Sequence, residues 1–167
     1  MRIGSDFDKV TFAVGEWQML EPNAIIGDTV LALVCIGMAN SIYQWKTRSP
    51  YFNYWIGFFA LFGCSLLLGG AGHTLFNYWG VTGKYFSWFS SMISLYLLER
   101  AVISEDRNLR RKRWLTSLSK FKVMLLIMAE IIVISMADLS VNPHLGLLVP
   151  SIATATSLLI YCGFIAV

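Results

Sequence analysis

Five long apolar stretches, separated by short polar segments, dominate the hydrophobic pattern of the chain. They cover residues 24–45, 51–72, 85–103, 121–139 and 145–167. Each is close to the roughly 20 mainly apolar residues that a helix needs to cross a bilayer. Few charged residues fall inside these stretches, as expected of segments solvated by lipid tails. The pattern therefore predicts an all-α fold, a polytopic membrane helical bundle of about five transmembrane helices.

The remaining residues divide the chain into a short tail and one membrane domain. Residues 1–23 contain four acidic side chains and no apolar core of a signal peptide, so we expect an external N-terminal segment. Residues 24–167 are expected to form the bundle, with a basic cytoplasmic loop at 104–120. The last apolar run ends without a polar tail, which leaves open whether the native chain continues past Val167.

Composition and charge agree with this picture and add an orientation. Charged residues make up only 14% of the chain, where about 25% is usual in soluble domains. Of the 13 lysines and arginines, ten lie in the first and third connections or at their edges, and three lie on the other side. Because positive charge is retained in the cytoplasm, the N-terminus is predicted to lie outside. The short loops favour a bacterial inner membrane as the location.

The basic run RRKR at 110–113 has two interpretations besides nucleic-acid binding, which is not expected without a recognisable binding module. It is expected to set the topology and meet anionic lipid headgroups, or alternatively to dock a protein. Small residues gather in CSLLLGGAGH and in PSIATATS, where they let neighbouring helices approach closely. The expected partners are therefore membrane lipids, together with a second copy of the chain or a larger membrane complex.

Five ionisable residues are predicted to meet at the outer leaflet, although they come from four separate segments. They are Glu21, Asp28, His73, Asp138 and His144. Histidines and carboxylates are ligands that zinc accepts, and a zinc-bound water is a hydrolytic nucleophile. No pair with the HxxxH or HExxH spacing is present. The spacing favours plain interfacial polar groups, and metal binding stays open as the alternative.

Three further ionisable residues lie in or at the edge of the apolar stretches. Glu130 is too deep to reach the headgroups, so we expect it to be protonated or paired with a polar group on another helix. Candidate partners are Asn40, Ser65, Ser90, Ser91 and Thr154. Glu99 and Arg100 end the third stretch, where snorkelling or a local ion pair is expected.

Two segments resemble the superfamily of membrane hydrolases and receptors that includes alkaline ceramidases and adiponectin-type receptors. EPNAIIGDTVLA is similar to its acidic-x-Asn motif, and LLLGGAGHTLF to its small-residue run ending in His-Thr-Leu. The resemblance implies that His73 is a zinc ligand, with Glu21 and Asn23 in the outer polar cluster. The chain departs from the family in having five stretches rather than seven. It also lacks an Asp early in the third stretch and an HxxxH in the last.

Three functions follow as alternatives. The first is a non-catalytic component that packs within a membrane assembly, which the incomplete catalytic motifs favour. The second is a metal-dependent membrane hydrolase of a lipid amide or ester, in which zinc would be held by the five residues at the outer leaflet. The third is a small transporter or channel subunit, with Asp28 and Glu130 lining a path.

Overall fold

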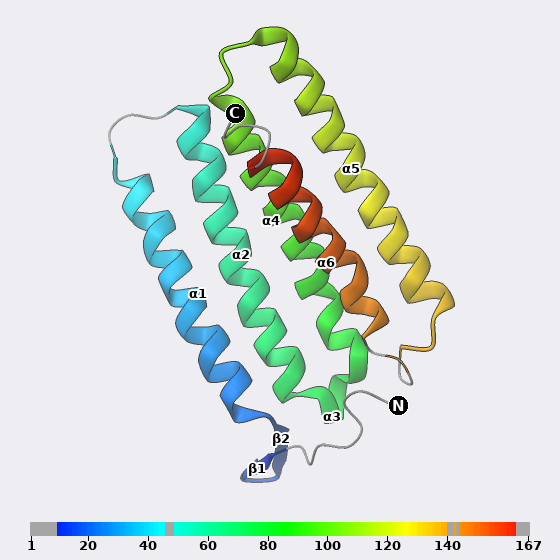
Figure 1. Cartoon of the computed structure of the whole chain (residues 1–167). Helices are drawn as coiled ribbons and strands as arrows, with labels where there is room; N and C mark the ends of the chain where they lie inside the picture. Colours follow the sequence, from blue (N-terminus) through cyan, green and yellow to red (C-terminus); the bar gives the residue numbers. More distant parts are fainter. Residues whose placement is uncertain (1–9, 46–48, 140–141, 143, 163–167) are drawn as a thin grey trace.

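The computed structural model describes residues 10–45, 49–139, 142 and 144–162. The chain is mostly helical, as predicted, and five long helices lie side by side and run alternately up and down (Figure 1). These helices are α1 (Pro22–Tyr43), α2 (Pro50–Thr74), α4 (Tyr85–Ser104), α5 (Leu109–Met136) and α6 (Leu145–Ser157). Short helical segments connect α2 to α4, namely α3 (Phe76–Trp79) and η1 (Gly80–Lys84). A π-helical turn, η2 (Leu158–Cys162), continues α6.

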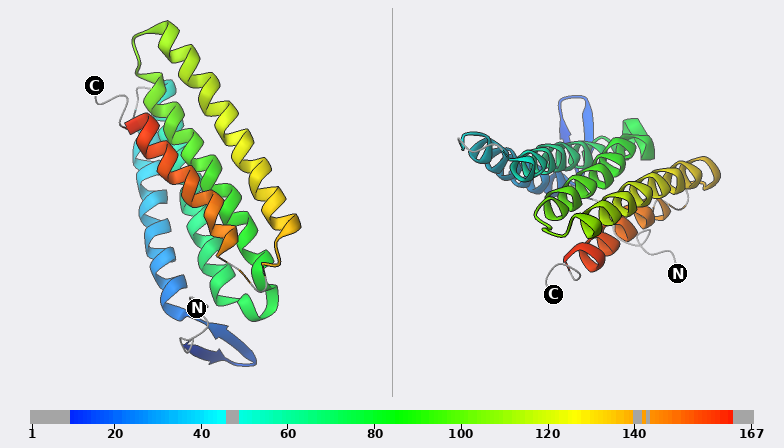
Figure 2. Two further views of the ribbon diagram at one scale, coloured as in Figure 1. Left: turned by 45° about the vertical axis from the view of Figure 1, so that its right-hand side comes forward. Right: turned by 90° about the horizontal axis from the view of Figure 1, so that it is seen from above.

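The centre of the bundle is α4, which packs against α2 on one side and against α5 and α6 on the other. Figure 2 shows α1 and α2 as one pair and α5 and α6 as a second pair, with α4 between them. Two helices, α1 and α2, are long and apolar enough to cross a membrane, as judged by length and composition. At about 1.5 Å per residue, their 22 and 25 residues extend over about 33 and 38 Å.

The start of α5 differs from the predicted basic loop at 104–120. The helix already begins at Leu109, because the Asn108 side chain caps it by accepting hydrogen bonds from the backbone N–H groups of Arg110 and Arg111. No glycine or proline interrupts residues 109–120, so the helix continues through the basic run. The predicted loop is therefore confined to residues 105–108, and the basic side chains extend from the first turns of α5.

Asp106 stabilises this short connection. Its carboxylate accepts hydrogen bonds from Arg111 Nε at 2.5 Å and Nη2 at 3.1 Å, and from the backbone N–H of Asn108 at 2.9 Å. These bonds hold the pKa of Asp106 below its ordinary value, with the Arg111 side chain as the largest cause. The connection therefore keeps a charged, ordered carboxylate at neutral pH.

The N-terminal segment contains a β-hairpin that the hydrophobic pattern did not predict. Strands β1 (Thr11–Val14) and β2 (Trp17–Leu20) pair antiparallel, with Val14 opposite Trp17. Gly15 has a φ of +63° and is the first of the two turn residues, as in a type II′ turn. The Trp17 ring packs on Tyr78, which attaches the hairpin to the connection between α2 and α4. Residues 1–9 of the predicted external segment lie outside the described residues.

A buried polar cluster joins α4, α5 and α6 near the end that carries the basic run. Glu99 is 1% exposed, and its carboxylate accepts bonds from the hydroxyls of Ser119 and Ser157, each at 2.5 Å, and from the Lys122 ammonium. The ammonium also donates to Ser157 Oγ at 2.7 Å and lies 5.4 Å from the centre of the Tyr161 ring. Glu99 thus pairs with a lysine on another helix, and its sequence neighbour Arg100 is not its partner.

Arg100 instead ties α4 to two other helices. Its guanidinium donates to the hydroxyl of Thr116 on α5 and, at 3.3 Å, to that of Tyr54 on α2. Glu130 is fully buried in α5, and neither of its carboxylate oxygens has a hydrogen-bond partner among the described residues. The polar partners expected for Glu130 are therefore not in contact with it in the described part of the chain.

Glycines of α2 pack inside the chain. A Cβ atom at Gly63 would lie 3.2 Å from Cys35 Cβ, and one at Gly70 would lie 3.1 Å from Asp28 Cβ, both on α1. The small residues of this segment therefore let α1 and α2 approach closely, as expected. In α6 the prediction holds in part, since Ala153 and Ser157 are buried while neighbouring small residues are exposed. Residues 163–167 of the fifth predicted stretch lie outside the described residues.

Candidate functional site

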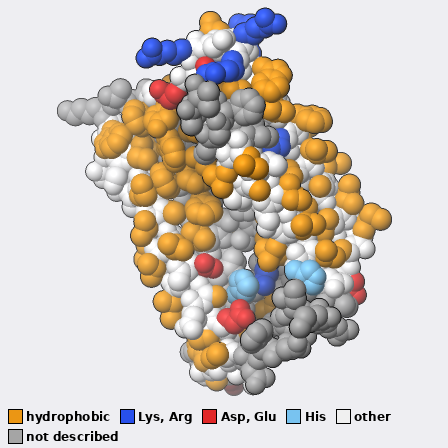
Figure 3. All heavy atoms as spheres, in the orientation of Figure 1, with side chains coloured by type: hydrophobic (Ala, Val, Ile, Leu, Met, Phe, Trp, Pro, Cys, Tyr) orange, Lys and Arg blue, Asp and Glu red, His pale blue; other side chains and the backbone are white. Residues whose placement is uncertain are grey.

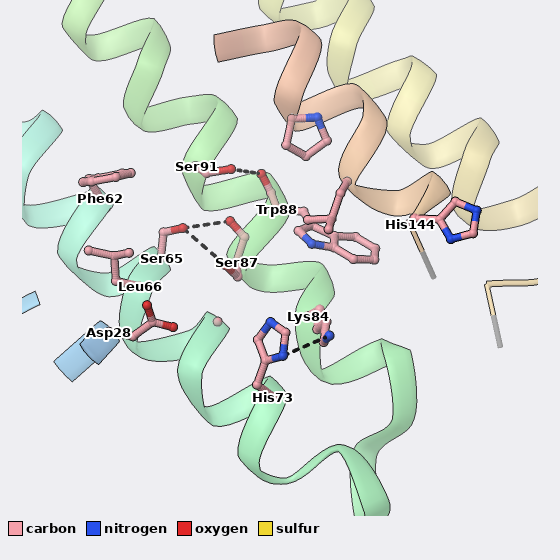
Figure 4. Close-up of a pocket in the computed structure, with 13 residues that line it drawn as sticks. Asp28, Phe62, Ser65, Leu66, His73, Lys84, Ser87, Trp88, Ser91 and His144 are labelled. Carbon is pink, nitrogen blue, oxygen red and sulfur yellow. Dashed lines mark hydrogen bonds between the residues drawn. The ribbon is translucent and has the colours of Figure 1, made fainter. Parts of the chain in front are cut away.

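A cavity of about 440 Å³ lies at the hairpin end of the bundle, between α2 and α6, with α4 behind it. Its walls are partly polar and partly apolar (Figure 4). The polar lining consists of Asp28, Ser65, His73, Lys84, Ser87, Ser91 and His144. The apolar lining consists of Phe62, Leu66, Trp88, Leu147 and Pro150, with Gly69 between the two sets. A cavity of this size and mixed lining is typical of sites for small molecules.

Close backbone packing brings the charged residues together. A Cβ atom at Gly72 would lie 2.7 Å from the Gly83 carbonyl oxygen, so only glycine allows the connection before α4 to pass so near α2. Lys84 follows directly, and its ammonium lies 3.3 Å from Nδ1 of His73. His73 and Lys84, eleven positions apart in the sequence, are thus in direct contact.

His73 also contacts Glu21, whose carboxylate oxygen Oε2 lies 3.2 Å from the same Nδ1. Glu21 precedes α1 with a φ of 50°, the only positive φ of a non-glycine residue among those described. Such backbone geometry costs about 1–3 kcal/mol and is concentrated at functional sites. Figure 4 shows the second ring nitrogen of His73 directed into the cavity.

The tautomer of His73 depends on which neighbour its Nδ1 forms a hydrogen bond with. A carboxylate accepts a proton and an ammonium donates one, so Nδ1 bonds to Glu21 or to Lys84 at any one time. Bonding to Glu21 requires N–H at Nδ1 and leaves the nitrogen in the cavity as an acceptor. Bonding to Lys84 reverses this and leaves an N–H donor in the cavity. The ring therefore adapts to the polarity of the group that it meets.

Two serines of the cavity are tied to the protein rather than exposed as reactive hydroxyls. Ser65 Oγ donates to the Ser87 carbonyl at 2.9 Å and lies 3.4 Å from Ser87 Oγ. Ser91 Oγ donates to the Trp88 carbonyl at 2.7 Å. These bonds leave oxygen lone pairs toward the cavity, where they can accept hydrogen bonds from a ligand.

The five residues predicted to cluster lie at the same end of the bundle but do not converge on one point. Glu21 and His73 are in contact, Asp28 shares their cavity, and His144 lies at its opposite wall. Asp138 is exposed beyond the end of α5 and is not among the residues that line the cavity. In the described part of the chain no three His, Cys, Asp or Glu side chains are grouped so that they could hold a metal ion. Zinc binding by these residues therefore stays a prediction.

Lys84 is the site residue that sequence reasoning missed. It was counted only as one of the few positive charges on the outer side. The signal that marks it is a lysine immediately before an apolar stretch, on the side where positive charge is otherwise scarce. Trp88 and Ser87 were also missed, because aromatic and small residues near span ends are common.

The surface around the site is divided by polarity. Figure 3 shows hydrophobic side chains over the middle of the visible face, with lysine and arginine gathered at the end where α5 begins. Histidine and acidic side chains lie toward the opposite end, next to a hollow. The cavity therefore opens at the boundary between a polar end and an apolar flank.

Comparison with known proteins gives a family but no activity. No curated protein and no solved structure matches the chain. The sequence model of DUF6962, a family of unknown function, matches residues 24–163, which include the long helices except for the first two residues of α1, and all residues that line the cavity. The chain therefore belongs to the DUF6962 family.

Proposed function

We propose that this protein is a non-catalytic membrane protein of five spans, with its N-terminus outside, that binds the polar head of an amphipathic ligand. The observation that carries this proposal is the mixed lining of the cavity. The charged groups of His73 and Lys84 lie toward the hairpin, while Phe62 lies at the far end of the cavity and hydroxyl groups line the wall between them. A lipid-like molecule has the same division between a polar head and an apolar body.

The five-span topology is supported by the shape and the charge of the bundle. The five long helices run alternately up and down, and large hydrophobic side chains such as Leu33, Phe121 and Leu148 are exposed on α1, α5 and α6. Exposure of so many apolar side chains is favourable in lipid and unfavourable in water. The basic first turns of α5 lie at the end opposite the cavity, so the positive-inside rule directs the cavity to the outer leaflet.

The position of the cavity favours lateral entry of a ligand. Both α2 and α6 pack on α4, and the cavity lies between them on the flank of the bundle. A ligand head can therefore occupy the cavity while its apolar chains stay beside Leu147 and Pro150 at the surface of the bundle. No step of this proposal requires bond breaking, which agrees with serine hydroxyls that bond to the backbone.

A cavity-filling variant tests the proposal. Ser91→Phe places a large ring in the cavity, whereas Ser41→Phe places the same ring on the exposed side of α1. Both serines donate to a backbone carbonyl of their own helix, so the pair is matched. Native mass spectrometry of detergent-solubilised protein with added dioleoyl phospholipid should show one retained lipid that is lost in S91F and kept in S41F. Equal retention in both variants would refute binding in this cavity.

A further inference from the structure

We infer that the cavity selects a zwitterionic lipid headgroup with a primary ammonium and a phosphate, that is, a phosphoethanolamine headgroup. This inference rests on the proposed function, because it names the headgroup of the amphipathic ligand. It is carried by the separation of charge within one cavity. Asp28 from α1 supplies the negative group, and Lys84 with His73 supplies the positive side.

Asp28 is the strongest indication of a cationic ligand group. Its carboxylate lies nearly two turns inside an apolar helix, and among the described residues no hydrogen bond or ion pair is formed with it. A carboxylate at this depth is unfavourable unless a cation or a hydrogen-bond donor accompanies it. A ligand ammonium would supply that partner. The expected contact is a charge-assisted hydrogen bond between the ammonium and the carboxylate.

Two adjacent glycines keep the carboxylate accessible. A Cβ atom at Gly70 would lie 3.2 Å from Oδ2 of Asp28, and one at Gly69 would lie 3.9 Å from the same oxygen and 3.0 Å from Ser87 Oγ. Any larger residue would therefore narrow the space between Asp28 and the serines of α4. The hydroxyl oxygens of Ser65 and Ser87 lie on that side and offer further acceptors for an ammonium.

The opposite side of the cavity suits an anion. The Lys84 ammonium lies 3.3 Å from His73 and 5.3 Å from the centre of the Phe76 ring, which holds it at the cavity mouth. A lysine ammonium carries three donors and is a common phosphate binder. When Nδ1 of His73 bonds to Lys84 or is protonated, its second nitrogen adds an N–H donor to the cavity. Phosphate therefore fits beside Lys84 and His73.

Phosphatidylglycerol and phosphatidylcholine satisfy these two sides only in part. Phosphatidylglycerol has the phosphate but places no cation beside Asp28. Phosphatidylcholine has a quaternary ammonium, which has no N–H to donate to the carboxylate or to the serines. A primary ammonium meets both requirements, so headgroup chemistry, rather than acyl chain length, should determine affinity.

The experiment uses the whole chain in mild detergent and native mass spectrometry with dioleoyl phosphatidylethanolamine, phosphatidylcholine and phosphatidylglycerol, each titrated separately. Phosphatidylethanolamine should bind about tenfold more tightly than the other two, the value of one charge-assisted hydrogen bond. Asp28→Asn should abolish this preference without loss of phosphatidylglycerol binding. Lys84→Met should weaken all three lipids, and Lys84→Arg should restore them. Glu16→Gln, an exposed carboxylate in the hairpin turn, is the matched control and should change nothing.

The outcomes separate the inference from the proposed function. Equal binding of the three lipids, unchanged in Asp28→Asn, would overturn the headgroup assignment while leaving a lipid-binding cavity. Absence of binding by every phospholipid would overturn both. Soluble glycerophosphoethanolamine serves as a further probe. If it binds as tightly as the lipid, the assignment to a lipid is wrong and the ligand is a soluble zwitterion.

Discussion

Removal of either member of the buried Glu99–Lys122 ion pair should destabilise the bundle strongly, whereas replacement of both should not. The Glu99 carboxylate is 1% exposed, so Lys122→Met leaves its charge with only the hydroxyls of Ser119 and Ser157. Glu99→Met leaves the ammonium with Ser157 and the face of the Tyr161 ring. Removal of one partner of a buried pair costs about 3–5 kcal/mol, because the other charge remains desolvated.

The double variant Glu99→Met/Lys122→Met removes both charges at once. Its cost is expected to be about 1–2 kcal/mol, because the two serine hydroxyls lose their carboxylate acceptor. Ser157 keeps its bond to the Ala153 carbonyl at 2.7 Å, which limits the loss. The coupling energy of the pair should therefore be at least about 4 kcal/mol, well above the error of a double-mutant cycle.

Equilibrium unfolding in mixed dodecylmaltoside and dodecyl sulfate micelles measures the four free energies. Lys120→Met is the matched control, because Lys120 lies two residues away on the same helix, is exposed and is expected to change stability by less than about 0.5 kcal/mol. If the two single changes add up to the double change within about 0.5 kcal/mol, the reasoning is refuted. Additivity would mean that Glu99 and Lys122 are each satisfied without the other.

Three further predictions follow from close contacts and from buried charge. Gly146→Ala should destabilise the protein by about 1–3 kcal/mol in the same unfolding assay, since its Cβ would lie 2.2 Å from Cη2 of Trp88; unchanged stability would show that the ring can move aside. Glu130→Leu should leave stability unchanged or raise it by up to about 1–3 kcal/mol, because it removes a buried carboxyl that has no hydrogen-bond partner among the described residues; a marked fall in stability would contradict that environment. Asp106 stabilises the α4–α5 connection above its lowered pKa, and this contribution should be lost as the pH falls through that pKa. Hydrogen exchange of that connection should therefore rise in acid, and Asp106→Asn, which removes the ion pair with Arg111, should abolish the acid response; an unchanged response would exclude Asp106 as its source.

Much of the secondary structure could be predicted from hydropathy alone. The third stretch, 85–103, differs from α4 by a single residue, because an aromatic interface residue begins it and charged residues follow it. The fourth predicted stretch, 121–139, begins twelve residues after the start of α5. The reason is that hydropathy marks where a helix enters lipid and not where its hydrogen bonds start. The basic run after Leu109 is polar enough to resemble a loop, yet Asn108 caps a helix there.

The site was predictable only in outline. Sequence order and helix direction placed Glu21, Asp28 and His73 at one end of the bundle, and the structure brings them to one neighbourhood. Asp138 also lies at that end, but it is not part of the cavity lining. The direction in which a side chain leaves its helix depends on helix rotation, and apolar stretches without a polar face do not fix that rotation.

The amino-acid sequence by itself determined that the chain is mainly α-helical and how many long helices it has, because long apolar runs allow few other structures. It also determined that the two ends of the bundle differ in charge. Only the tertiary structure decided which polar groups meet. Contact between Lys84 and His73 depends on the Gly72–Gly83 approach, and the Glu99–Lys122 pair depends on the packing of α4 against α5. Such contacts join residues on different helices, and their distances are set by packing that no local pattern encodes.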